Sequence, residues 1–196
     1  MKKTTVGITI LIMAVIVGAV GCYAYFAGKS RQEAEEAALS TVQLALTRDL
    51  QNDYPATVKE VVRYYTELQK CFYNEECTDE ELEALAMQAR LLYDDELLAA
   101  NEVPAYLDRL RAEVASFRSQ NCRITGVAVA ASTSVFYFQE DGYSFARIHC
   151  GYTISEKVVQ SSNTGVVYLL RQDENKRWKI YGWKTVSAIP SSGGGQ

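Results

Sequence analysis

His149, the only histidine of the chain, is the side chain best suited to proton transfer near neutral pH. In an alternating strand it shares one face with Tyr143 and Arg147. If that face lines an internal cavity, the three side chains form a polar cluster able to hold an anionic ligand. An outward orientation is favoured, because the opposite face carries small and apolar residues that suit a core: Ala146, Ile148, Cys150 and Tyr152.

No catalytic residue is predicted from this cluster. The strands around His149 offer no acidic side chain that would pair with it, because Glu140 and Asp141 are better explained as turn residues. One histidine and a Cys-x5-Cys spacing match no common zinc site. We therefore expect no metal, no cofactor and a role other than catalysis.

Four cysteines lie outside the apolar amino-terminal segment: Cys71, Cys77, Cys122 and Cys150. An even number of cysteines in a modest domain favours two disulfides in an oxidising, extracytoplasmic compartment. A local Cys71–Cys77 bridge would leave Cys122 and Cys150 to pair, yet a simple hairpin turning near Asp141 places Cys150 opposite a residue near position 132. The connectivity therefore stays open, and the alternative is four reduced, buried cysteines in a cytosol-facing domain.

The amino-terminal segment is predicted to anchor the protein in a membrane. The chain has 196 residues, is 48% hydrophobic and has a net charge of -4, but residues 4–28 carry no charge at all. This run exceeds the roughly 7–15 apolar residues of a cleavable signal peptide and reaches the ~20 needed to span a bilayer. Tyr23, Tyr25 and Phe26 lie at its far end, where aromatic side chains prefer the membrane interface.

The orientation of this anchor follows from the cysteines rather than from charge, since Lys2 and Lys3 are nearly balanced by Lys29 and Arg31. A disulfide-bonded body places the amino terminus inside and the carboxyl-terminal domain outside the cell membrane. The stretch before Cys22 loosely resembles a lipobox, which leaves a lipoprotein anchored at Cys22 as the alternative.

Three Ser/Thr-x-x-Glu sequences predict helix starts, at Ser30, Thr57 and Thr78. Helical spacing of apolar residues follows each of them, and a further helix starts at Asn101 or Val103. From Cys122 the residues become β-branched and aromatic. They predict a strand over 123–140, a second over 143–157, and a hairpin over 166–171 and 177–186.

Helices followed by strands predict an α+β domain in which amphipathic helices pack on a curved antiparallel sheet of four or more strands. We expect a transmembrane anchor over 1–28, a stalk helix over 29–56, the folded domain over 57–187 and a flexible tail over 188–196.

Residues 30–120 carry 19 acidic and 9 basic residues, and 121–196 carry 5 acidic and 8 basic. This charge distribution argues against a nucleic-acid partner. Tyr64 points away from the apolar stripe of its helix and is expected to be an exposed contact residue.

The order of elements resembles the nuclear transport factor two-like superfamily of cone-shaped, cystatin-like domains. Residues 57–65 look like its first helix, and Tyr168–Arg171 with Lys176–Trp183 look like its closing hairpin. Residues 91–98 further resemble a group of uncharacterised, singly membrane-anchored proteins of Gram-positive anaerobes. The superfamily holds enzymes, transport factors and secretion scaffolds, so the resemblance implies a fold and not an activity.

We therefore expect a membrane-tethered extracytoplasmic domain that binds or assembles with a component of the cell envelope without catalysis. The alternatives are a scaffold subunit of a secretion or conjugation apparatus, and a small-molecule binder or enzyme that uses the cone cavity. The partners implied are the membrane itself and either another protein or a second copy docked through the sheet.

Overall fold

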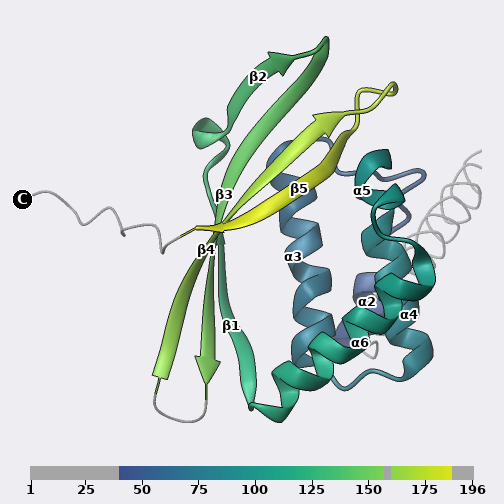
Figure 1. Cartoon of the computed structure of the whole chain (residues 1–196), viewed down its shortest axis with the longest axis vertical. Coiled ribbons are helices and arrows are strands. Elements are labelled where there is room, and N and C mark those ends of the chain that lie inside the picture. Colours follow the sequence, from purple (N-terminus) through teal and green to yellow (C-terminus); the bar gives the residue numbers. More distant parts are fainter. Residues whose placement is uncertain (1–39, 157–159, 187–196) are drawn as a thin grey trace, which may run out of the picture. The chain divides into compact units, whose positions relative to one another are not determined.

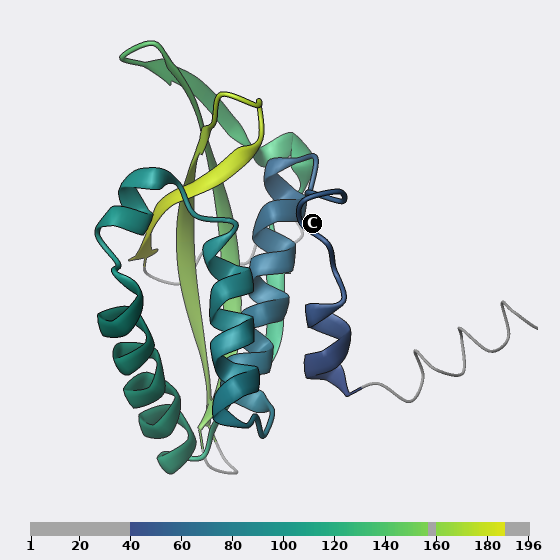
Figure 2. The same ribbon diagram turned by 90° about the vertical axis from the view of Figure 1, so that its right-hand side faces the viewer.

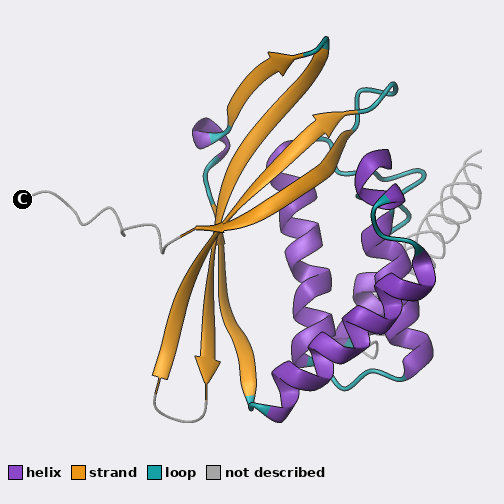
Figure 3. Ribbon diagram, in the orientation of Figure 1, coloured by secondary structure: helices purple, strands orange, loops and turns teal. Residues whose placement is uncertain are grey.

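The computed structural model describes residues 40–156 and 160–186. Contacts between residues divide the chain into two compact units, Met1–Ser40 and Thr41–Gln196, and the described helices and strands belong to the second unit. It is an α+β domain with its helices packed against a five-stranded antiparallel sheet (Figure 3). Its elements are α2 (Thr41–Leu46), α3 (Val58–Asn74), α4 (Asp79–Arg90), α5 (Asp95–Ala99), α6 (Val103–Ser119), β1 (Cys122–Val129), η1 (Ser132–Ser134), β2 (Phe136–Glu140), β3 (Tyr143–Glu156), β4 (Gln160–Gln172) and β5 (Trp178–Val186).

Two of the three predicted helix starts are confirmed in atomic detail. The Thr57 hydroxyl accepts from the Glu60 amide, and the Glu60 carboxylate accepts from the Thr57 amide. The same reciprocal pair joins Thr78 and Glu81 at the start of α4. Each pair satisfies two backbone N–H groups that a helix otherwise leaves without partners. The Ser30 sequence lies outside the described residues.

The expectation for Tyr64 is wrong, because its side chain is 3% exposed. Its hydroxyl donates to the Ala45 carbonyl at 2.8 Å and accepts from the Gln88 amide at 2.9 Å. The Arg48 guanidinium lies 4.9 Å from the centre of its ring. Helix α2 and the residues after it cover this side of α3, a long-range contact that the periodicity of α3 alone does not reveal.

The predicted stalk helix ends earlier than expected, since α2 stops at Leu46. The Asp49 carboxylate accepts from the Gln51 amide at 2.9 Å and from the Asn52 side chain at 2.6 Å, which fixes a turn. Such short-range bonds from Asp compete with helical hydrogen bonding. Val42 and Leu50 are nevertheless buried in the same core as α3 and α4, so the folded unit begins at Thr41.

The sheet has the strand order β1-β3-β4-β5, and β2 also pairs with β3. Strand β3 is the long central element: β2 pairs with its first residues, from Tyr143 to Arg147, and β1 with its last, from Cys150 to Glu156. Helices α3, α4 and α6 all lie on one side of the sheet (Figures 1 and 2). Register shifts between Ile124 and Gly126 in β1 and between Leu169 and Leu170 in β4 add local bends.

A single strand over 123–140 is not observed. The chain leaves the sheet after Val129, forms the short 3-10 helix η1, and re-enters as β2. The Ser132-Thr133-Ser134 run supplies hydroxyl side chains that favour local turns over a continuous ladder. The turn predicted near Asp141 is present, with Asp141 at φ 50° and Gly142 at φ 81°.

The segment between α4 and α5 docks against β5 and ties the helical layer to the sheet edge. The Ile180 amide donates to the Leu92 carbonyl at 2.8 Å, and the Asp94 amide donates to the Ile180 carbonyl at 2.9 Å. The Asp94 carboxylate also accepts two hydrogen bonds from Arg171, at 2.6 and 2.9 Å. Because Asp94 also caps α5, one buried carboxylate links a helix start, a loop and the sheet.

None of the helices within residues 40–156 and 160–186 has the length and apolarity needed to cross a membrane. The predicted span at 4–28, Cys22 and the tail at 188–196 lie outside the described residues.

Candidate functional site

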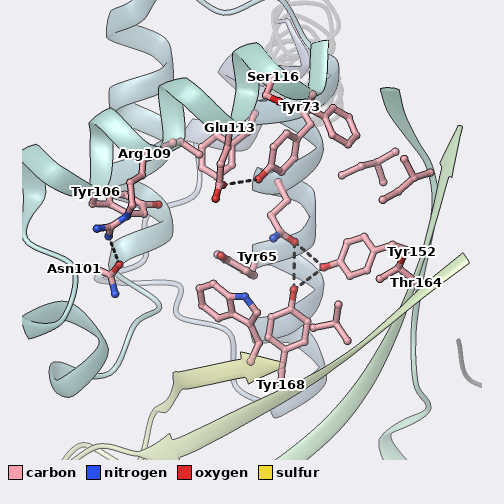
Figure 4. Close-up of a pocket in the computed structure, with 18 of the residues that line it drawn as sticks. Tyr65, Tyr73, Asn101, Tyr106, Arg109, Glu113, Ser116, Tyr152, Thr164 and Tyr168 are labelled. Atoms are coloured by element: carbon pink, nitrogen blue, oxygen red, sulfur yellow. Dashed lines mark hydrogen bonds between the residues drawn. The ribbon is translucent and has the colours of Figure 1, made fainter. Parts of the chain in front are cut away.

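A cavity of about 580 Å³ opens between α6, α3 and the sheet. Six of the 13 tyrosines line it together with Trp183, Phe72 and Phe117. In Figure 4, Arg109, Glu113 and Ser116 of α6 lie across the cavity from Tyr152 and Tyr168 of the sheet. This volume is in the range of pockets that hold small organic ligands.

The floor of the cavity is a hydrogen-bonded triad of Gln69, Tyr152 and Tyr168 (Figure 4). The Gln69 carbonyl oxygen accepts from Tyr152 at 2.6 Å and from Tyr168 at 3.3 Å, and the two tyrosine hydroxyls lie 2.6 Å apart. The side chains come from α3, β3 and β4, so the triad fixes the distance between the helix and the sheet. Both phenols are buried, which leaves them rigidly held.

A second pair of phenols, Tyr65 and Tyr93, lies beside this triad with their hydroxyls 3.0 Å apart. Burial raises the pKa of Tyr65, Tyr93, Tyr152 and Tyr168 above the ordinary value of a phenol. These hydroxyls therefore stay protonated at neutral pH. They can donate and accept hydrogen bonds there, but a neutral phenol with a raised pKa is poorly suited to act as a base.

The mouth of the cavity is polar. Arg109, Glu113 and Ser116 follow one another at helical spacing along α6, and Gln120 comes directly after the helix; all four are exposed. The Arg109 guanidinium donates to the Asn101 side chain at 2.6 Å, and Tyr73 donates to the Glu113 carboxylate at 3.3 Å. Trp183, 45% exposed, completes the mouth on the sheet side.

The cluster suggested by the sequence does not line this cavity. Tyr143, Arg147 and His149 are exposed, whereas Ala146, Ile148, Cys150 and Tyr152 are buried, so the outward orientation favoured from the sequence is the one observed. Arg147 lies over the rings of Phe136 and Phe138, at 5.2 and 5.1 Å from their centres. The residues proposed for an anionic ligand thus lie on the opposite face of the sheet from the cavity.

All four cysteines of the described domain are free thiols in the structure. Cys122 pairs with Glu156 and Cys150 with Val129, so the two lie at opposite ends of the β1–β3 ladder, roughly 20 Å apart. A disulfide needs Cα atoms within about 7 Å, so a Cys122–Cys150 bridge, one of the pairings left open by the sequence, does not fit this register. The Cys77 thiol lies 3.6 Å from the Cys71 carbonyl oxygen, and a Cys71–Cys77 bridge stays a prediction.

Burial raises the pKa of the Cys71 and Cys150 thiols to about 11, so both are poor nucleophiles at neutral pH. Across residues 40–156 and 160–186, no group of three or more His, Cys, Asp or Glu side chains is placed to hold a metal ion. The aromatic cavity is therefore taken as the candidate binding site of the described domain.

Sequence reasoning offered a cone cavity as an alternative but missed the residues that line it, although two signals pointed to them. Gln69 is a polar residue on the inward face of α3, one turn after Tyr65. In α6, the polar positions Arg109, Glu113 and Ser116 run beside the apolar residues Tyr106 and Leu110, which makes the buried stripe unusually narrow. Both signals mark a helix face that is neither fully packed nor fully solvated.

Fold and site together define an α+β domain with a preformed, aromatic-lined pocket of ligand size. Residues 1–183 match the family described as a domain of unknown function, DUF6715, and the chain belongs to that family. Comparison with curated proteins finds no match.

Proposed function

We propose that this chain is a non-enzymatic ligand-binding protein whose cone-shaped domain, of the nuclear transport factor two-like superfamily, is tethered to the outer face of a membrane. The observation that carries the binding role is the cavity of about 580 Å³ with its prearranged hydroxyl groups. Rigid polar groups in an otherwise aromatic pocket fix the orientation of a ligand at little entropic cost.

The superfamily assignment is supported by the arrangement of the elements. The residues that carry the resemblance correspond to α3 and to the β4–β5 hairpin. The helices lie on one side of the sheet, and the cavity lies between the helical layer and the strands. The tether is supported by the sequence alone, through the uncharged run at 4–28.

The absence of catalysis is supported by the chemistry of the floor. Four buried phenols with raised pKa values stay neutral, and the only histidine is exposed on the other face of the sheet. A general base near neutral pH would need a group whose pKa lies close to 7 within reach of the ligand.

A blocking substitution at the mouth tests the binding role. Ser116→Phe places a ring over the cavity, whereas Ala115→Phe adds the same ring to an exposed position of α6 that does not line it. Full-length protein and both variants, purified in detergent, are incubated with a small-molecule extract of the cells that make them, and bound compounds are identified by mass spectrometry. We expect a compound enriched on the wild type and on Ala115→Phe, and lost on Ser116→Phe. Equal enrichment on all three proteins, or none on any, would contradict the proposal.

A further inference from the structure

The charges at the mouth of the cavity cancel. Arg109 and Glu113 lie one helical turn apart on α6, and both line the cavity. Among the described residues neither side chain forms an ion pair, and each makes one hydrogen bond, to Asn101 and from Tyr73 respectively. A ligand with a net charge of either sign meets one attractive and one repulsive group there. A wholly apolar ligand would remove water from both groups without replacing its hydrogen bonds.

The floor offers donors that the protein itself does not use. The Gln69 carbonyl oxygen accepts from Tyr152 and Tyr168, which directs the amide nitrogen away from the triad. Within the described part of the chain, no hydrogen bond is formed by that nitrogen, and Gln69 lines the cavity. A planar amide has two N–H donors, so the floor is prepared for a ligand that brings oxygen acceptors.

The aromatic ring of Trp183 lies next to these polar groups in the lining of the cavity. The Trp183 ring is held at the mouth by contacts with Tyr65, at 5.8 Å between ring centres, and with Tyr168, at 6.3 Å. With 45% of its surface exposed, it presents a ring to the solvent side of the cavity. A flat apolar surface of this kind packs against rings with C–H faces.

We propose that the ligand is a neutral, hydroxyl-rich ring compound, namely one unit or a short run of a saccharide; this inference rests on the proposed binding function. A sugar ring has an apolar C–H face for Trp183 and hydroxyl oxygens that accept from Gln69 and Arg109. Its hydroxyl protons are donated to the Glu113 carboxylate. The polar stripe of Arg109, Glu113, Ser116 and Gln120 extends these contacts along α6, which suits a linear saccharide.

The test uses the fluorescence of Trp183 in the full-length chain. The protein has two tryptophans, so Trp178→Phe leaves Trp183 as the single reporter. The detergent must be free of sugar, which excludes maltosides and glucosides. The probes are the neutral trisaccharides tri-N-acetylchitotriose and cellotriose, with deacetylated chitotriose as the positively charged counterpart.

We expect a saturable change in Trp183 fluorescence with at least one neutral trisaccharide. The charged trisaccharide should gain no affinity from its charge, because its attraction to Glu113 is offset by its repulsion from Arg109. The change is retained in Ala115→Phe and lost in Ser116→Phe. Affinity for the neutral sugar stays constant between about 50 and 500 mM salt, because a neutral sugar forms no ion pair with the protein that salt could screen. Gln69→Leu weakens binding by about tenfold, the effect of losing a hydrogen bond in a protected site.

The inference is overturned if neither neutral trisaccharide binds, or if the charged one binds at least about tenfold more tightly than both of them, since a site for neutral ligands gives no such preference. If Ser116→Phe still abolishes capture of a different compound from the cell extract, the binding function stands and only the saccharide assignment falls. If no compound depends on Ser116, both fall.

Discussion

Arg171 is the most highly constrained charged residue of the described domain. Its guanidinium donates to both carboxylate oxygens of Asp94 and to Glu96, and it lies between the rings of Tyr143 and Tyr181, at 4.7 and 4.9 Å from their centres. The side chains of Arg171 and Asp94 are 13% and 5% exposed. A buried pair of this geometry is costly to break, because removal of Asp94 leaves the buried Arg171 guanidinium with the exposed Glu96 as its remaining carboxylate partner.

We expect Asp94→Ala to lower the free energy of unfolding by about 3–5 kcal/mol, as other broken buried pairs do. Urea unfolding followed by circular dichroism measures it. Arg111→Ala is the matched control, because Arg111 also has two carboxylate neighbours, Glu83 and Asp108, but with an exposed side chain. Its cost should stay below about 1 kcal/mol. A loss under 1 kcal/mol for Asp94→Ala would show that the Arg171 network does not hold the loop to the sheet.

At the scale of the elements, the helices differ in how firmly their starts are fixed. Helix α3, which carries Tyr65 and Gln69, begins with a complete capping box at Thr57. Helix α6, which carries the mouth of the cavity, begins at Glu102 without a side-chain hydrogen bond to its first turn. The wall that contributes the polar stripe is thus the less well anchored of the two at its start.

Substitutions at the starts of α3 and α6 are expected to change the free energy of unfolding in opposite directions. Thr57→Ala should lower the free energy of unfolding by about 1 kcal/mol, because the Glu60 amide loses the hydroxyl to which it donates. Glu102→Ser should raise it by several tenths of a kcal/mol to about 1 kcal/mol, because a hydroxyl can accept from the Ala105 amide. Chemical denaturation of the two variants beside the wild type measures both. Equal effects of the same sign would contradict the assignment of the caps.

The sequence located α3, α4 and α6 because their caps and apolar spacing are local signals. It did not locate the cover that α2 gives to Tyr64, since that cover depends on a contact between residues far apart in the sequence. The residues that line the cavity were missed because they too meet only through distant contacts. Gln69, Tyr152 and Tyr168 lie far apart along the chain and meet only through the pairing of β3 with β4 and the packing of α3 on them.

For the whole molecule, the buried phenols couple stability to pH. A tyrosine whose pKa is raised in the folded state contributes stability that is fully present below the pKa of the unfolded chain, about 10, and is lost above it. Tyr65, Tyr93, Tyr152 and Tyr168 all shift in this direction because they are buried.

We therefore expect the free energy of unfolding to fall steeply above pH ~10, by about 1.4 kcal/mol per pH unit for each of these phenols. Urea titrations at several alkaline pH values measure the slope, and absorbance at 295 nm reports tyrosine ionisation. The two signals should change together. In Tyr168→Phe one titrating group is absent, so the slope should be shallower by about 1.4 kcal/mol per pH unit. Ionisation of all tyrosines before unfolding would contradict the burial.

The cysteines connect the fold to the compartment in which it works. Cys71 and Cys77 lie at the junction of α3 and α4, and the Cys77 thiol reaches the Cys71 carbonyl oxygen at 3.6 Å. Cys122 and Cys150 are held apart by the register of β1 on β3. In an oxidising compartment the local pair is therefore the candidate for a disulfide, whereas a Cys122–Cys150 bridge would require a different register of β1 on β3.

Peptide mapping of full-length protein, alkylated in intact cells and then unfolded, distinguishes the compartments. An outer location predicts one bridge, Cys71–Cys77, with Cys122 and Cys150 recovered as free thiols that react only after unfolding, because both side chains are buried. A reduced sample from the same cells is the control. Free thiols at all four positions would place the domain in a reducing compartment and remove the argument that orients the anchor. A Cys122–Cys150 bridge would instead contradict the strand register, because the pairing of β1 with β3 holds these two residues at opposite ends of the ladder.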